Sequence, residues 1–291
     1  MTGPADGDDQ PRFRSGFATI VGRPNVGKST LLNAVLGSKV SIVSDKPQTT
    51  RTQVRGVLDR DDVQIVFVDT PGIHKPVTAA GERFNATARR ALDDVDVACF
   101  VLDATKPLGR GDRFVAARLP AANTLCVVNK VDIAGREQVL TQLQAAAELG
   151  LAEYFPVSAA TGQGLGPLVE AIVARLPEGP RYYPEGTVTD VPDAFWVAEL
   201  VREQLLAVAR EELPHSIACR VTDWEWPRIT VEILVERDSQ KGIVIGKGGE
   251  VLKRVGTAVR EQLTPGAYLE LRVRVEPDWQ RRPHALDRLG L

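Results

Sequence analysis

Residues 22–30 read GRPNVGKST and fit the pattern G-x-x-x-x-G-K-S, which binds phosphate groups. They follow an apolar stretch, FATIV at residues 17–21, and precede a segment that suits a helix, Ser29–Leu36. Glycines let backbone amides turn inward around phosphate oxygens, and the start of a helix adds a favourable dipole. The stretch therefore predicts a triphosphate-binding loop between a strand and a helix of an α/β domain.

Within this loop Lys28 would place its charge between the outer phosphates, and the Ser29 hydroxyl would ligate Mg²⁺. The whole loop is predicted to contact the nucleotide, namely Gly22, Arg23, Pro24, Asn25, Val26, Gly27, Lys28, Ser29 and Thr30.

The rest of the first half alternates apolar runs with amphipathic segments. Residues 63–69, 95–103 and 124–130 are nearly continuous apolar runs rich in Val and Ile. Such runs are typical of strands that are covered on both faces, and hence of a mostly parallel sheet. Arg136–Leu149 has apolar residues at helical spacing, and Leu165–Leu176 is predicted to be the last helix of the domain. We expect an α/β domain with helices on both faces of its sheet.

Two further motifs indicate which base is bound. Asn129, Lys130, Val131 and Asp132 form N-K-x-D directly after a buried run. Asp132 can accept hydrogen bonds from the ring N–H and the exocyclic amine of guanine, whereas adenine offers neither, so adenine would leave a carboxylate unpaired. A backbone amide for the guanine oxygen would come from the segment Ser158, Ala159 and Ala160.

Two other segments would respond to the terminal phosphate. Asp69 would hold Mg²⁺ through water and the Gly72 amide would meet the γ-phosphate, within the run Asp69, Thr70, Pro71, Gly72 and Ile73. Thr49 and Thr50 lie where a first switch segment is expected, and we favour Thr50 as the Mg²⁺ ligand. An exposed loop with no metal contact is the alternative for this pair.

The second half has a different organisation. Four prolines between residues 177 and 192 predict an irregular linker. After it come a helix, two alternating strands, a glycine loop among short helices and a third strand, which predict a small α+β domain. The predicted divisions are a disordered tail at 1–14, a nucleotide domain at 15–178, a linker at 179–193, a second domain at 194–278 and a tail at 279–291.

The glycine loop of the second domain, Gly246-Lys247-Gly248-Gly249, is not a second nucleotide loop, because its spacing is wrong and no Ser or Thr follows the lysine. It fits the GXXG loop of a KH domain, which clamps about four single-stranded nucleotides. Residues 237–260 carry six basic and two acidic residues, a local net charge of +4. The predicted RNA-binding residues are Ile243, Ile245, Gly246, Lys247, Gly248, Gly249, Lys253 and Arg254.

The forms GRPNVGKSTLLN, PQTTR, DTPGIHKP and NKVD together resemble the bacterial Era GTPases, from about residue 16 to the end of the chain. The resemblance implies a Ras-like GTPase domain followed by a type II KH domain, with the nucleotide state coupled to RNA binding. It further implies the 3′ end of 16S ribosomal RNA as the target and assembly of the 30S subunit as the task.

One position departs from Ras-type chemistry. Ile73 stands where a water-orienting glutamine is found in Ras-type enzymes, and isoleucine cannot position the attacking water. We therefore expect slow unassisted hydrolysis, with Lys28, Thr50 and Gly72 as candidate catalytic residues. The resemblance adds Asn25 as a further candidate catalytic residue, because it would help to bind K⁺ as an activator. His74 as a direct base is a less favoured alternative.

The overall composition is that of a globular protein and does not indicate which partner it binds. The chain has 291 residues, of which 43% are hydrophobic and 25% charged, and its net charge is −2, so any RNA-binding field must be local. No run reaches the length of a membrane span, and we expect a cytoplasmic protein, with peripheral attachment at the inner face of the cell membrane left open. Two alternatives remain: an RNA-binding protein that binds nucleotide without turnover, and a GTPase acting on a protein or membrane-associated partner.

Overall fold

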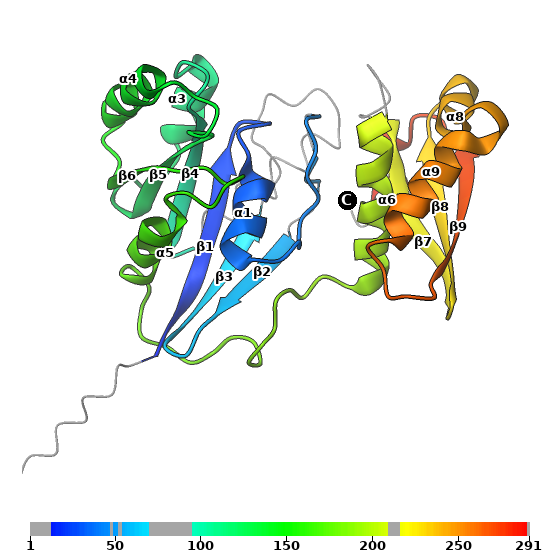
Figure 1. The fold of residues 1–291 in the computed structure, drawn as a ribbon, viewed down its shortest axis with the longest axis horizontal. Helices are drawn as coiled ribbons and strands as arrows, with labels where there is room; N and C mark the ends of the chain where they lie inside the picture. The colour runs from blue at the N-terminus through cyan, green and yellow to red at the C-terminus, as the bar shows by residue number, and fades with distance from the viewer. Residues whose placement is uncertain (1–12, 47–48, 52–53, 70–94, 209–215, 290–291) are drawn as a thin grey trace, which may run out of the picture.

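The computed structural model describes residues 13–46, 49–51, 54–69, 95–208 and 216–289. Two domains lie side by side, joined by a segment that crosses from the first to the second (Figure 1). The predicted N-terminal tail falls mostly outside the described residues.

The first domain is built on a six-stranded sheet with the order β2-β3-β1-β4-β5-β6. Five of the strands are parallel, and β2 alone runs antiparallel, to β3. The strands are β1 (Arg14–Gly22), β2 (Val54–Asp59), β3 (Val63–Asp69), β4 (Val97–Asp103), β5 (Thr124–Asn129) and β6 (Glu153–Pro156). Because β3, β4 and β5 are buried along their whole length, they need cover on both faces.

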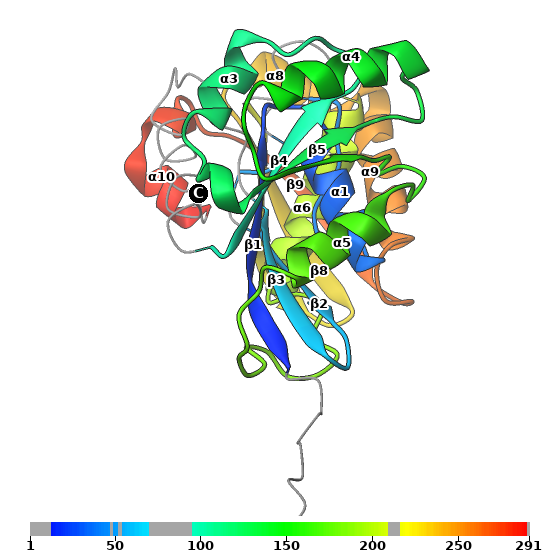
Figure 2. The same ribbon diagram turned by 90° about the vertical axis from the view of Figure 1, so that its left-hand side faces the viewer.

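Helices supply that cover. Leu31 and Leu32 of α1 share one apolar cluster with Leu168 and Ile172 of α5, and Figure 2 shows α1 and α5 together on one side of β1. A second cluster contains residues of α3 and α4. The helical elements are α1 (Lys28–Leu36), α3 (Arg110–Ala116), η1 (Ala121–Asn123), α4 (Arg136–Ala147) and α5 (Leu165–Val173). The mostly parallel α/β fold predicted from the sequence is confirmed.

Residues 179–192 of the predicted linker form no helix or strand, but they are held against the first domain. The side chain of Gln64 accepts hydrogen bonds from the amides of Tyr182 and Tyr183, at 2.8 and 2.9 Å, and donates to the carbonyl of Tyr183 at 3.0 Å. The Val57 amide donates to the carbonyl of Val188 at 2.8 Å. The linker therefore follows β2 and β3 before it crosses to the second domain.

The second domain has a three-stranded sheet with the order β7-β8-β9, in which β7 and β8 are antiparallel and β8 and β9 parallel. One face of this sheet packs against helices α6 and α9 through a shared apolar cluster. The elements are α6 (Asp193–Val208), β7 (Ala218–Glu225), β8 (Arg228–Val235), α8 (Asp238–Ile245), η2 (Lys247–Gly249), α9 (Glu250–Arg260) and β9 (Tyr268–Val275). The predicted α+β order is confirmed.

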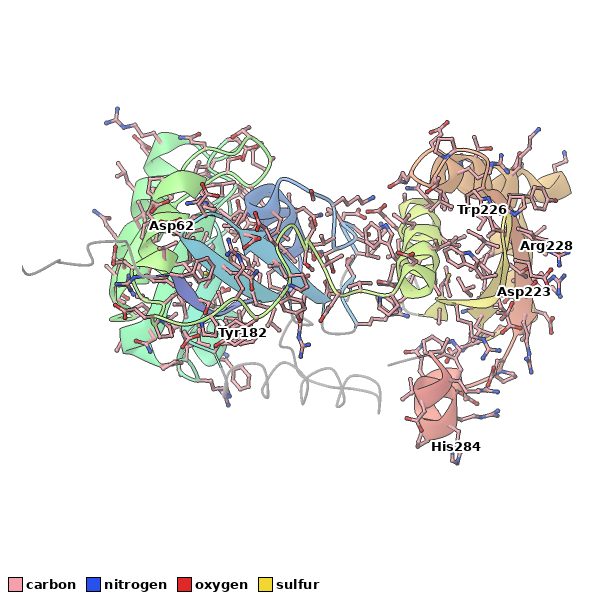
Figure 3. All side chains as sticks on the ribbon, turned by 90° about the horizontal axis from the view of Figure 1, so that it is seen from below. Asp62, Tyr182, Asp223, Trp226, Arg228 and His284 are labelled. Carbon is pink, nitrogen blue, oxygen red and sulfur yellow. The ribbon has the colours of Figure 1, made fainter. Side chains whose placement is uncertain are left out.

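The C-terminal segment, expected to be a tail, instead folds onto the other face of this sheet. It forms η3 (Trp279–Arg281) and α10 (Pro283–Arg288). Trp279 is 1% exposed, and its Nε1 donates to the carbonyl of Ser216 at 3.0 Å. Trp279 and Leu286 bury apolar surface against Ala218 and Leu234, which explains why the segment is ordered. Figure 3 shows His284 on the outer side of α10, away from the sheet.

Candidate nucleotide-binding and RNA-binding sites

The predicted phosphate loop connects the end of β1 to the start of α1. Gly27 has φ 96°, and a Cβ atom there would lie 2.3 Å from Nδ2 of Asn129. Only glycine suits both the backbone angle and the close approach. Residues 27–30, at the start of α1, line a pocket whose opposite side is formed by Val43, Ser44, Lys46, Thr49 and Thr50. This is the geometry by which a helix N-terminus binds phosphate.

Lys28 is almost fully buried in this pocket. Its Nζ donates to the carbonyl of Arg23 at 2.9 Å. Burial lowers the pKa of Lys28 to about 8, against the opposing effect of Asp69. An anion in the pocket would favour the charged ammonium, so the site is suited to bind phosphate.

Oxygen atoms from three segments meet beside Lys28. The hydroxyls of Ser29 and Thr50 lie 3.0 Å apart, and they donate to Oδ2 of Asp69 at 3.0 and 3.2 Å. Thr49 instead turns its hydroxyl to the carbonyl of Lys46, at 2.8 Å. The structure thus brings Thr50, and not Thr49, to the predicted metal ligands. Ser41 also donates to Asp69, at 3.0 Å, a contact that no sequence signal indicated.

The Asp69 carboxylate is 0% exposed, and its Oδ1 has no hydrogen-bond partner among the described residues. Burial is the main cause that raises the pKa of Asp69, whereas Lys28 and the hydroxyls lower it. A buried carboxylate oxygen without a partner is costly. Hydroxyl and carboxylate oxygens are ligands that Mg²⁺ prefers, so this group of residues fits such an ion and its waters.

The predicted guanine-binding residues lie together on the other side of the loop. Asn129 Nδ2 donates to the carbonyl of Val26 at 2.9 Å, and its Oδ1 accepts from the Ala159 amide at 3.0 Å. Ser158 Oγ donates to Oδ1 of Asp132 at 2.7 Å, which fixes that carboxylate. Val131 is half-buried and Ala160 is exposed. The loops after β5 and β6 are therefore tied to the phosphate loop as one site.

Lys130 and Asn25 lie at the mouth of the pocket. Lys130 Nζ donates to the carbonyl of Asn25 at 2.7 Å and to Asp103 at 2.8 Å. Asp103 was not predicted as a site residue, although its place at the carboxyl end of buried β4 could have indicated it. Asn25 has φ 65°, and its Nδ2 donates to the carbonyl of Asp45 at 2.7 Å.

The predicted residues Thr70, Pro71, Gly72 and Ile73 lie outside the described residues, as does His74.

The second glycine loop lies on the surface, between α8 and α9. Gly246, Gly248 and Gly249 have φ angles of 77°, 61° and 80°. A Cβ atom on Gly246 would lie 2.5 Å from Val251, whereas one on Gly248 would meet nothing within 4 Å. Another chain can therefore approach the backbone at Gly248.

The predicted basic and apolar residues around this turn differ in exposure. Lys247, Lys253 and Arg254 are exposed, and Ile243 is 55% exposed, while Ile245 is half-buried. The turn is thus bordered by cations and by an accessible apolar side chain, as binding of single-stranded RNA requires.

Family models match both domains. The model described as a 50S ribosome-binding GTPase matches residues 17–130, and the KH domain model matches residues 212–280. GTPase Era of Mycobacterium tuberculosis strain H37Rv is 48% identical over 297 residues, which cover 96% of this chain and 99% of that protein. The chain belongs to the Era GTPase family. GTPase Era of Mycobacterium sp. strain KMS is 46% identical over the same share of both chains.

Solved Era structures have the same arrangement of domains. Era in complex with MgGDPNP and nucleotides 1506–1542 of 16S ribosomal RNA has a TM-score of 0.91 and 38% identity, over 96% of this chain and 99% of that one. A variant of Aquifex aeolicus Era bound to GDP and AlF4⁻ has a TM-score of 0.90, with the same identity and coverage. This Era-family chain is thus a GTPase with a C-terminal KH domain. Among the described residues, no helix has the length and apolar character needed to span a bilayer.

Proposed function

We propose that the chain couples GTP hydrolysis to binding of single-stranded RNA, with the 3′ end of 16S ribosomal RNA as its target. Its role would be assembly of the 30S subunit in the cytoplasm. The exposed Gly246–Gly249 turn, in the same chain as the phosphate pocket, is the observation that carries the proposal. The similarity to Era solved with 16S ribosomal RNA supports the choice of target.

In the nucleotide site, the loop amides and Lys28 would bind the phosphates and stabilise the charge that develops during transfer. Ser29 and Thr50 would ligate Mg²⁺, and Asp69 would hold it through water, since its Oδ1 is buried without a partner among the described residues. When bound, Mg²⁺ neutralises charge on the β- and γ-phosphates. We assign Gly72 to the γ-phosphate on its motif alone.

Base selection would depend on Asp132. Ser158 holds one oxygen of its carboxylate, which leaves the other able to accept hydrogen bonds from guanine. The Ala159 amide donates to Asn129, and this contact supports the assignment of the turn at Ser158–Ala160 to the base site. An adenine ring would leave the carboxylate without donors, so the site would bind guanine selectively.

We include K⁺ in the proposal because Ile73 cannot orient water. Asn25 Nδ2 donates to the carbonyl of Asp45 at 2.7 Å, which holds the Asn25 side chain at the mouth of the pocket. Its side-chain oxygen is the atom that would ligate K⁺, as neutral carbonyl oxygens do in K⁺-selective sites. A monovalent cation there would add positive charge near the γ-phosphate.

In the KH domain, the glycine turn would lie against the sugar-phosphate backbone of RNA. Lys247, Lys253 and Arg254 would contact phosphates, and Ile243 would contact bases. Two measurements test the target. RNA can be crosslinked to the protein in cells and identified, and the RNA that copurifies with GTP-loaded protein can be sequenced. We expect enrichment at the 3′ end of 16S ribosomal RNA, and enrichment of unrelated RNA alone would refute this choice.

A protein or membrane partner is the second candidate. Trp224, Trp226 and Tyr268 are 40%, 55% and 57% exposed, and the Tyr268 amide donates to the carbonyl of Pro227 at 2.8 Å. Exposed aromatic side chains at neighbouring strand ends suit a protein surface or a lipid interface. Figure 3 shows Trp226 on the part of the KH domain remote from the GTPase domain. Vesicle co-sedimentation that Trp226→Ala abolishes, without loss of RNA crosslinks, would favour peripheral membrane attachment.

A further inference from the structure

Helix α6 of the KH domain contacts the segment that carries Thr50. Arg202 Nη2 donates to the carbonyl of Thr49. Its neighbour Glu203 accepts from the Val43 amide at 2.9 Å and from the ammonium of Lys39. Arg202 and Glu203 are consecutive in α6. Arg202 thus binds Thr49, and Glu203 binds Lys39 and Val43.

Arg51 makes the reverse contact, from the GTPase domain into the KH domain. Its Nη1 donates to the carbonyl of Ile217, just before β7, at 2.7 Å. Its guanidinium also lies over the ring of Trp279, 5.7 Å from the ring centre. Arg51 is 5% exposed, although it belongs to a loop of the other domain.

Thr50 lies between these two contacts. The carbonyl of Thr49, immediately before it, is held by Arg202, and the side chain of Arg51, immediately after it, is held by Ile217 and Trp279. With the backbone restricted on both sides, the Thr50 hydroxyl lies 3.0 Å from that of Ser29. A predicted metal ligand is therefore flanked on both sides by contacts to the KH domain.

These contacts are too specific to be incidental packing. Arg202 and Glu203 are 2% and 8% exposed, and burial of charge is unfavourable unless each group is paired and hydrogen-bonded. Arg202 is paired with Glu199 through two bonds, at 2.7 and 2.6 Å, while its Nη1 has no hydrogen-bond partner among the described residues. Burial and the nearby Arg202 lower the pKa of Arg51 to about 9, while Glu199 opposes the shift, so Arg51 is charged at neutral pH. The interface uses the backbone carbonyl of Thr49 and the side chain of Arg51, which lie on either side of Thr50.

We propose that Arg51, Arg202 and Glu203 are positioning residues for GTP hydrolysis, through which the KH domain holds Thr50 at the Mg²⁺ site. The inference rests on the proposed role of Thr50 and not on the identity of the RNA. Since Thr50 would be ligated only when the γ-phosphate is present, contact with the KH domain should favour GTP over GDP. By linkage, bound GTP should in turn stabilise this arrangement of the two domains.

The test compares full-length Arg51→Met and Arg51→Lys with wild type. Arg51→Met should weaken binding of the GTP analogue GDPNP by about tenfold and lower kcat by a similar factor, while GDP affinity stays within about twofold. Arg51→Lys should recover part of the loss, because it keeps the charge. Arg55→Met, four residues on, removes a guanidinium that contacts Asp190 of the linker, and it should change neither affinity.

A double-mutant cycle with Thr50→Ala identifies the route of the effect. If Arg51 acts through Thr50, adding Arg51→Met to Thr50→Ala should cause no further loss of GDPNP affinity. Additive losses would overturn the proposal, as would an unchanged GDPNP/GDP ratio in Arg51→Met. Should Arg51→Met lose both nucleotides equally through misfolding, Glu203→Gln provides the decision. Glutamine keeps the shape of the side chain and can still accept from the Val43 amide, and only the charge that pairs with Lys39 is lost. An equal effect of Glu203→Gln on both nucleotides, or no effect, would refute the proposal.

Discussion

Asn129 supports the phosphate loop through Val26, whose carbonyl accepts a hydrogen bond from the Asn129 side-chain amide at 2.9 Å. The same side chain accepts from Ala159, so one buried residue joins the phosphate and guanine segments. Asn129→Ala should lower the free energy of unfolding by roughly 2–4 kcal/mol, because two buried backbone groups lose their partners.

Thermal or urea unfolding measures the stability lost in Asn129→Ala. The affinities of this variant for GDP and GDPNP should both fall at least tenfold. Asn123→Ala, at an exposed position of η1, is the matched control and should be close to neutral. Unfolding of Asn129→Ala indistinguishable from wild type would show that the two bonds do not hold the site together.

Asp132→Asn should change base selection. An amide presents a donor where the carboxylate presents an acceptor, so the variant should lose affinity for GDP by about a hundredfold or more. Xanthosine diphosphate has a carbonyl at the position of the guanine amine, and the variant should bind it better than wild type does. Competition binding of both nucleotides measures the exchange, and a parallel loss of both would contradict the role given to Asp132.

The predictable part of this molecule consists of contiguous motifs with their own chemistry. Three motifs could be recognised from a few consecutive residues: the phosphate loop, N-K-x-D and the glycine turn. Each of them combines particular backbone angles with particular side chains. Strand β2 was not predicted, because Gly56 and Arg55 interrupt its apolar pattern. Gly56 is needed because Leu36 of α1 packs directly against it: a Cβ atom on residue 56 would lie 2.3 Å from the Leu36 side chain.

Contacts between distant segments left no sequence signal. Arg202 and Glu203 belong to an amphipathic helix, where charged residues are expected to face water. They are buried because Lys39, Val43 and Thr49 of the other domain contact them. The ordered C-terminus was missed for a similar reason, since Trp279 becomes a core residue only against the outer face of β7 and β8.

Lys28 should make nucleotide binding depend on pH. Its pKa is lowered to about 8 by burial, and phosphate favours the charged form. At pH 8 binding of GDP should therefore take up about half a proton, falling to about a tenth at pH 7, and affinity should decrease as the pH rises through 8. Calorimetry in buffers of different ionisation enthalpy measures this uptake, and equal heats in all buffers at pH 8 would rule it out.

Potassium should accelerate hydrolysis through Asn25. Wild-type turnover should be severalfold faster in K⁺ than in Na⁺ at equal ionic strength, because K⁺ would supply charge near the γ-phosphate. Asn25→Gly removes the side chain and still accepts the φ of 65°, so its turnover should be slow and equal in both salts. Phosphate release measures both, and equal wild-type rates in the two salts would exclude K⁺ activation.

Gly248 allows a test of RNA binding that leaves the fold intact. Its φ of 61° is accessible to Asp and Asn, and an added Cβ atom meets nothing within 4 Å. Gly248→Asp places a negative charge where RNA phosphates would approach, so affinity for a 16S 3′-end oligonucleotide should fall by tenfold or more, while Gly248→Asn, which has the same shape, should lose much less. Filter binding at two salt concentrations, alongside GDP affinity as a control for folding, measures the difference. Equal affinities of the two variants would mean that RNA phosphates do not approach this turn, and the RNA surface would have to be sought elsewhere on the KH domain.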